Sequence, residues 1–288
     1  MEDWSRHLGE HMSLRINTNL ASINSQRQLF NTNLGMQRNL ERLSSGSRIN
    51  RAADDAAGLA ISENLRAQIR GMKQANRNAN DGISLAQVAE GGLNEISNML
   101  IRMRELAIQG ASDTVSDVER GFIDMEFQGL KKEIQRVAEV TEYNGQELLN
   151  GLGGAYEIQV GVHNDPFQDR IIFDATQADV TLDALGLTSE TLAGKDTARN
   201  TLSVIDESLT KVKATRADLG AFQNRLVSTI NNLNIAHENL SAANSRIRDA
   251  DVAEETAELT RNNIMLQANM STLNQANNVT NLALKLLN

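Results

Sequence analysis

Two short clusters in the chain contain residue types that could bind a metal ion. His7 and His11 are four residues apart, so a helix would place both imidazoles on one face. That pair lies in a short leading segment, where a solvated tail is the better interpretation. His237-Glu238 begins like the helix of a zinc protease, but the second histidine of that motif is missing. The sequence therefore predicts no metal site.

A carboxylate pair, Asp54-Asp55, is the remaining cluster whose side chains could take part in catalysis or binding. Adjacent side chains on a helix point in different directions, and carboxylates at a helix start are stabilised by the helix dipole. We therefore expect both residues to act as caps. The sequence also contains no glycine-rich phosphate loop, no serine–histidine–aspartate arrangement and no basic patch interleaved with aromatic residues. These observations predict a protein that is not an enzyme and that has no catalytic residue and no cofactor.

The composition favours long helices and excludes several classes of function. The 288 residues include one proline, no cysteine and 3% aromatic residues, and the formal net charge is −9. A single proline permits long helices, and few aromatic residues fit a slender bundle better than a thick globular core. The acidic balance argues against nucleic-acid binding. No apolar run approaches the roughly 20 residues of a membrane span, so we expect no membrane insertion.

Apolar residues recur at sevenfold spacing near both ends of the chain. This spacing is typical of a coiled-coil seam, and polar residues within such a seam fix its register at some cost in stability. An amphipathic helix docked on its own domain gives the same pattern, so periodicity leaves both interpretations open. The predicted polymerisation seam comprises Ile16, Leu20, Ile23, Phe30 and Leu34 near the start, and Leu259, Leu266, Met270, Leu273, Leu284 and Leu287 near the end.

The middle of the chain combines further helices with a short β segment. One long apolar stripe ends at Gly110, and Ser116–Glu119 has the pattern of a capping box that opens the next helix. A third stripe extends over Leu202–Leu240, whereas Tyr156–Val162 alternates at period two. We expect a mainly α fold, a long helical coiled-coil bundle with paired terminal helices and a small β-hairpin insert near residues 154–175.

Several long motifs give the sequence a specific resemblance. The Ser-Ser-Gly break followed by an Asp-capped helix rich in small residues is unlike a generic helix. Together with four further segments it resembles bacterial flagellin, the subunit of the flagellar filament. The resemblance covers residues 13–288 and is weakest between about 150 and 195. The motifs are Ser13–Asn19, Leu43–Ser62, Ile101–Gln109, Arg216–Leu226 and Glu238–Asp251.

The resemblance implies a division of the chain into domains. Residues 13–55 and 250–288 would form an inner domain of terminal helices, and residues 56–249 a helical bundle domain with the hairpin. The large outer domains that many flagellins insert in the middle of the chain are expected to be absent. Residues 1–12 depart from the family, which usually begins at the position of Met12. We expect this extension to be disordered or not translated.

The function implied by the resemblance is structural. The chain is expected to be secreted unfolded by the flagellar type III exporter and to polymerise with copies of itself at the distal tip of a filament used for swimming. Implied partners are an export chaperone, the filament cap and the hook–filament junction proteins. A hook–filament junction protein of the same architecture is an alternative. A helical binding module that does not polymerise is an alternative of another class.

The resemblance also implies recognition by Toll-like receptor 5. In flagellins that this receptor detects, an arginine and a leucine of one helix and a glutamate of the next dominate the contact. The matching positions are Arg102, Leu106 and Glu126. Arg102 and Leu106 are four apart and share a helix face, which would place an apolar anchor beside a cation. The alternative is structural, with Leu106 packing the bundle and Glu126 a solvated charge.

Overall fold

The computed structural model describes residues 18–285, with side chains as far as Asn278. Its elements follow the order α1 (Leu20–Ser45), α2 (Ala56–Gly110), α3 (Asp117–Val140), β1 (Glu142–Tyr143), β2 (Gln146–Glu147), β3 (Ala155–Gln159), β4 (Arg170–Asp174), α4 (Leu182–Leu185), α5 (Lys195–Arg248) and α6 (Val252–Lys285). The predicted mainly α fold with a small hairpin is confirmed. The expected extension at residues 1–12 lies outside the described residues.

The chain divides into two compact units. The terminal unit contains the residues up to 65 and those from 242 onward, and the central unit contains residues 66–241. Both divisions fall inside the long helices α2 and α5. The domain boundaries expected from the sequence, after residue 55 and before residue 250, lie instead at the ends of these helices.

Short-range hydrogen bonds explain where several helices begin and end. The Asn19 side chain accepts a hydrogen bond from the Ser22 amide at the start of α1, and Gly46 ends this helix in the left-handed conformation with φ +67°. The capping box predicted at Ser116 and Glu119 is present at the start of α3. Asp55 accepts a hydrogen bond from the Gly58 amide at 2.8 Å, so it caps α2 as expected.

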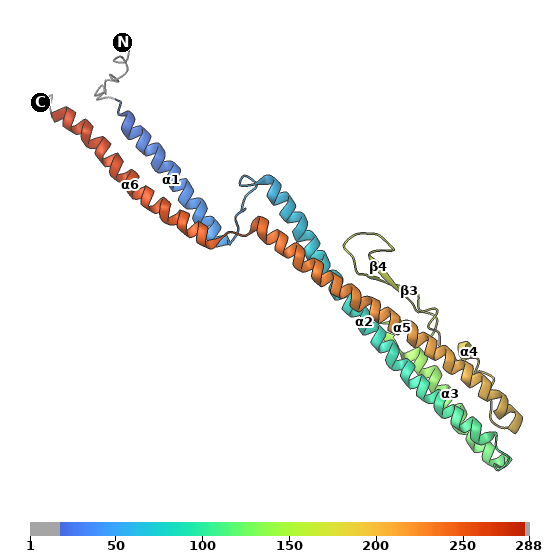
Figure 1. Cartoon of the computed structure of the whole chain (residues 1–288). Helices are drawn as coiled ribbons and strands as arrows, with labels where there is room; N and C mark the ends of the chain where they lie inside the picture. The colour runs from blue at the N-terminus through green and yellow to red at the C-terminus, as the bar shows by residue number, and fades with distance from the viewer. Residues whose placement is uncertain (1–17, 286–288) are drawn as a thin grey trace, which may run out of the picture. The chain divides into compact units, whose positions relative to one another are not determined.

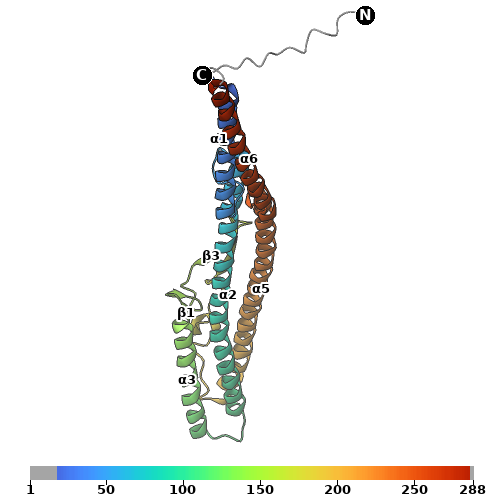
Figure 2. The ribbon, with the colours of Figure 1, turned by 90° about the vertical axis from the view of Figure 1, so that its left-hand side faces the viewer.

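Three long helices form the core of the central unit. In Figures 1 and 2, α2 lies beside both α3 and α5. The stripe predicted on α5 is buried from Ile205 to Leu226, whereas Ile230, Leu233 and Leu240 beyond it are only partly covered. Fully buried large side chains come from α2 and α3, and Ile205 and Leu226 on α5 are buried to the same degree; those on α2 and α3 are Leu93, Ile96, Leu100, Met103, Leu106, Phe127 and Ile134. This unit therefore has an apolar core of its own.

The predicted hairpin is confirmed as strands β3 and β4, which pair antiparallel from Ala155↔Asp174 to Gln159↔Arg170. Phe173 on β4 packs the hairpin against α5, because the centroids of the Phe173 and Phe222 rings are 5.6 Å apart. A second hairpin, β1–β2, was not predicted. Asn144 and Gly145 connect its strands with φ +52° and +75°. Positive φ at both central residues is typical of the tightest hairpin turn.

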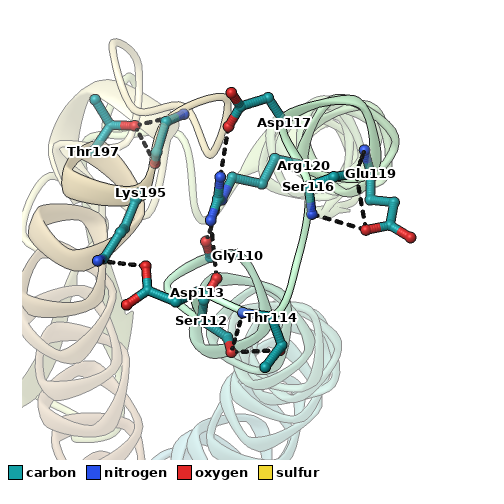
Figure 3. A network of polar contacts seen from close by, with 11 residues as sticks. Gly110, Ser112, Asp113, Thr114, Ser116, Asp117, Glu119, Arg120, Lys195 and Thr197 are labelled. Atoms are coloured by element: carbon teal, nitrogen blue, oxygen red, sulfur yellow. Dashed lines mark hydrogen bonds and ion pairs between the residues drawn. The ribbon is translucent and has the colours of Figure 1, made fainter.

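A buried arginine joins α2 to α3. Arg120 is 7% exposed, and its guanidinium donates to the carbonyl oxygens of Gly110 and Ser112, each at 2.9 Å (Figure 3). It also pairs with Asp117 at 2.6 Å. Gly110 is the last residue of α2, so the guanidinium satisfies a carbonyl that the helix end leaves free.

A surface ion pair connects the start of α5 to the turn between α2 and α3. Lys195 lies 2.5 Å from the Asp113 carboxylate (Figure 3). The hydrogen bond and the charge of Lys195 lower the pKa of the Asp113 carboxyl. This exposed pair connects α5 to the α2–α3 turn in addition to the apolar core.

Two adjacent glycines before β3 allow a test of how closely the chain packs at the start of the hairpin. A Cβ at Gly153 would lie 2.4 Å from the Glu147 carbonyl oxygen, whereas a Cβ at Gly154 would meet no atom within 4 Å. We expect Gly153→Ala to lower the free energy of unfolding by about 1–3 kcal/mol, because backbone must move. Gly154→Ala is the matched control and is expected to change it by less than about 1 kcal/mol. Urea unfolding followed by circular dichroism measures both, and equal values would contradict the close contact.

Candidate assembly surface

The terminal helices α1 and α6 run side by side in opposite directions (Figures 1 and 2). Apolar residues repeat every seven positions on the facing side of each helix and are partly buried there. They are Leu29, Met36 and Leu43 on α1, and Leu259, Leu266 and Leu273 on α6. The predicted register on α6 therefore faces α1. The facing register on α1 was not identified from the sequence, although its sevenfold spacing was available as a signal.

Polar contacts alternate with these apolar positions along the whole pair. Ser22 Oγ donates to Asn277 at 3.0 Å, and the Asn269 amide donates to Thr32 at 3.1 Å. In the amide orientation that satisfies both of its ends, Asn39 accepts from Asn262 at 3.2 Å.

An ion pair closes the other end of the helix pair. Arg42 donates to Glu255 Oε1 at 2.9 Å, and Glu255 is 7% exposed. The interface between the two helices is therefore substantially polar.

The apolar register predicted on α1 points away from α6. Leu20, Ile23 and Phe30 are 61%, 53% and 62% exposed, and Leu34 is 38% exposed. We call these four residues the outer stripe. These members of the predicted polymerisation seam therefore lie outside the partly buried face of α1, which is the one with Ser22, Leu29 and Asn39. Large apolar side chains remain exposed along this helix.

The remaining members of the predicted seam differ in position. Met270 is 53% exposed and does not face α1 as its neighbours Leu266 and Leu273 do. Ile16 and Leu287 lie outside the described residues, and the side chain of Leu284 lies beyond the described side chains.

The connectors that join these helices to α2 and α5 are held together by backbone bonds. Ser47 and Asp249 form an antiparallel bridge, and the Ala250 amide donates to the Gly46 carbonyl at 3.0 Å. Ile49 is 1% exposed, and a Cβ at Gly58 would lie 2.9 Å from its Cδ1 atom. The small residues of this motif therefore permit a close contact at the junction.

Asp54, the first residue of the carboxylate pair, stabilises the same connector. Asp54 accepts hydrogen bonds from the backbone amides of Arg51 at 3.0 Å and Asn50 at 3.2 Å. These bonds lower the pKa of the Asp54 carboxyl, because they stabilise its charged form. Asp54 thus holds the turn before α2, while Asp55 caps the helix itself.

The three residues matched to the receptor contact are brought together only in part. Arg102 on α2 lies 2.8 Å from Glu126 on α3 and 3.0 Å from Glu105. The hydrogen bonds that Arg102 donates to Glu105 and Glu126 raise the pKa of Arg102. Leu106 is 2% exposed and belongs to the core. The expected apolar anchor beside Arg102 is therefore absent from the surface of the subunit.

The described residues contain neither a metal-binding cluster nor a membrane-spanning helix. No group of three His, Cys, Asp or Glu residues that could hold a metal ion occurs among residues 18–285. His237 is partly buried on α5, and His7 and His11 lie outside the described residues. In the same part of the chain, every helix is too short or too polar to cross a membrane.

Two family models match most of the chain. The model of the bacterial flagellin N-terminal helical region matches residues 16–153, and that of the bacterial flagellin C-terminal helical region matches residues 202–287. The unmatched residues between them contain β3, β4 and α4. This is the region in which the motif resemblance is weakest.

Individual relatives cover nearly the whole chain. The flagellin of Halalkalibacterium halodurans is 46% identical over 273 residues, covering 94% of this chain and 99% of the relative. The flagellar filament 33 kDa core protein of Treponema phagedenis is 41% identical over 285 residues, with the same two coverages.

A solved structure shares the fold at lower identity. The structure of a putative flagellar hook-associated protein from Vibrio parahaemolyticus has a TM-score of 0.56 and 15% identity. It covers 68% of this chain and 100% of that chain. At this identity the likeness shows a shared fold only.

Proposed function

Because the chain belongs to the bacterial flagellin family, we propose that it is a structural subunit that polymerises into the extracellular flagellar filament used for swimming. The observation that carries this proposal is the outer stripe of α1. Soluble proteins normally expose large apolar residues singly, whereas here four of them lie together on one face of one helix. Such a face needs a covering partner, and in a filament that partner is another copy of the chain.

The balance of energies explains why many neighbours are needed. Complete burial of one large apolar side chain contributes about 1.5–3 kcal/mol, and the outer stripe has roughly half of that left to gain. Ordering the backbone of the terminal helices costs about 1–2 kcal/mol per residue. An isolated helix pair with a polar interface is therefore marginal. We infer that residues 13–55 and 250–288 order fully when the subunit joins an existing filament end, which favours growth at the tip over spontaneous nucleation.

The alternatives are less well supported. A hook–filament junction protein would share this architecture, but the relatives at 41–46% identity are a flagellin and a filament core protein, whereas the hook-associated structure is 15% identical. A helical binding module without polymerisation would cover the outer stripe with a different protein, whereas these relatives are named as a flagellin and a flagellar filament core protein. The electron microscopy of purified protein distinguishes them, because only a filament subunit forms long filaments alone.

The family also suggests the other partners of the chain. Export in an unfolded state, delivery by a chaperone that binds the C-terminal helix, and growth beneath a filament cap fit a subunit whose terminal helices are not self-sufficient. Attachment to hook–filament junction proteins fits the shared fold of the hook-associated protein. These partners are proposed from the family and from the amphipathic character of the ends.

Polar substitution of the outer stripe should block assembly without unfolding the subunit. We expect Phe30→Ser to raise the critical concentration for seeded assembly at least about tenfold, because one contact of about 1.4 kcal/mol is lost for every subunit. Phe30 is 62% exposed, so the thermal unfolding of the free subunit should be unchanged. Phe30→Leu is the control and should assemble normally. Sedimentation of filaments measures the effect, and normal assembly of the serine variant would remove the outer stripe from the mechanism.

Removal of residues 250–288 should separate folding from assembly. The apolar core of the central unit lies within residues 66–241, so the truncated chain should keep a cooperative thermal transition. It should form no filaments, because α6 is absent and α1 has no partner within the chain. Circular dichroism and electron microscopy test the two halves of this prediction. Filaments from the truncated chain would refute the role of the terminal pair.

We also propose recognition of the free subunit by Toll-like receptor 5 through the exposed Arg102–Glu126 pair. Arg102→Ala and Glu126→Ala should weaken a receptor assay with monomers at least about tenfold, and intact filaments should be much less active. Arg104→Ala is the matched control. Arg104 lies on α2 like Arg102 and makes a similar exposed ion pair, at 2.8 Å, with Asp206 on α5. Leu106→Ala is uninformative about contact, since it would cost about 2–5 kcal/mol of stability. Equal activity of wild type and both pair variants would refute the proposal.

A further inference from the structure

Four pairs of polar side chains between α1 and α6, among the residues whose side chains are described, form what we call the ladder, and each pair is a rung. These rungs are Arg42–Glu255, Asn39–Asn262, Thr32–Asn269 and Ser22–Asn277. We propose that this ladder determines the register in which α1 and α6 pair. The consequence for filament growth rests on the proposed function, whereas the register can be tested on the chain alone.

The apolar contacts of the pair do not choose a register by themselves. Leu29, Met36 and Leu43 repeat every seven residues, and so do Leu259, Leu266 and Leu273. A slide of seven residues exchanges one apolar neighbour for another of similar size, so the apolar seam tolerates it. The connector between α1 and α2 extends over residues 46–55, and its roughly 33 Å reach exceeds the roughly 10 Å of such a slide.

The ion pair penalises a slide in either direction. A slide one way places Glu255 opposite Gly35, and a slide the other way places Arg42 opposite Asn262. Glu255 is 7% exposed, and its Oε2 atom has no hydrogen-bond partner among the described residues, so Arg42 is the cation that compensates the charge. A buried carboxylate that loses its cation is strongly unfavourable. The shifted registers are therefore disfavoured.

The middle of the ladder depends on a close approach at Gly35. A Cβ at this position would lie 3.2 Å from Asn262 Nδ2, so the amide occupies space that the glycine leaves open. A slide of seven residues would replace Gly35 by Gln28 or Arg42 opposite the same amide. Either side chain would fill this space and separate the helices locally. Rungs that differ from one another along the pair thus identify one register, as single polar residues do in coiled coils.

The absence of cysteine from the sequence allows a direct measurement of register. Ser22→Cys with Asn277→Cys reports the native register, because the two side chains are in hydrogen-bond contact. Ser22→Cys with Met270→Cys and Leu29→Cys with Asn277→Cys report slides of seven residues in the two directions. A disulfide needs Cα atoms within about 7 Å, so each pair reports its own register. Full-length chains are oxidised in solution and after assembly, and the disulfides are quantified by peptide mass spectrometry.

Each pair is placed in three backgrounds. The first, called the natural background, keeps the three rungs that the reporter cysteines do not replace, and the second is an apolar ladder with Arg42→Leu, Glu255→Leu and Asn262→Leu. The third is a matched control with Arg38→Leu, Glu254→Leu and Asn263→Leu, which changes similar residues at exposed positions of the same helices. Glu255→Gln alone is a milder variant that removes the charge and keeps the side-chain volume.

In the natural and control backgrounds, native-register disulfides should exceed shifted ones at least about tenfold. In the apolar ladder, and to a lesser degree in Glu255→Gln, the shifted disulfides should rise to a comparable yield. Confinement of both variants to the native register would overturn the proposal and assign the register to the Gly46–Ala250 junction. Shifted disulfides at equal yield in the natural background would overturn it as well. Failure of every chain to form filaments would contradict the proposed function, while the soluble chains would still test the ladder.

Discussion

The rest of the structure depends on how α1 divides its two faces. One face meets α6 through serine, threonine, asparagine and an arginine–glutamate pair, with partly buried leucines between them. The other face holds the outer stripe, which no element of the chain covers among the described residues. Apolar burial is the dominant source of stability, and polar contacts contribute less because they replace bonds to water. A helix with this division completes its burial only when other molecules cover it.

The central unit, in contrast, buries a core of large apolar side chains within one chain. Its helices α2, α3 and α5 enclose buried residues such as Leu100, Phe127 and Ile205, and the hairpin β3–β4 is anchored on them by aromatic contacts. Its ends are fixed by specific bonds, among them the buried Arg120 at the α2–α3 turn. A unit with its own core completes its burial without neighbours. The chain thus divides into a unit with a closed apolar core and a terminal unit whose outer stripe is exposed.

The ladder between α1 and α6 has a consequence for any ordered polymer. Identical subunits make identical contacts only when their exposed faces have the same position relative to the rest of the chain. A helix pair held by leucines alone would tolerate several alignments, and each would present the outer stripe at a different height. Polar rungs sacrifice some stability for a single alignment. In the proposed filament, burial of the outer stripe by neighbouring subunits would supply the lost stability.

Much of the secondary structure of this protein could be predicted from its sequence, because it depends on interactions between neighbouring residues. Capping by Asp55 and Ser116, the helix end at Gly110 and the hairpin near residues 154–175 depend on neighbouring residues, and the motifs at both ends identified the family. Heptad spacing also showed that α1 and α6 have apolar faces. It did not show which face of α1 meets α6, because Ile23 and Leu29 belong to stripes of similar character. Only the tertiary structure decided that polar side chains occupy the face of α1 that meets α6. It also decided that Leu106 lies in the core and that Arg102 pairs with Glu126. These choices depend on side chains far apart in sequence, whose complementarity local spacing does not encode.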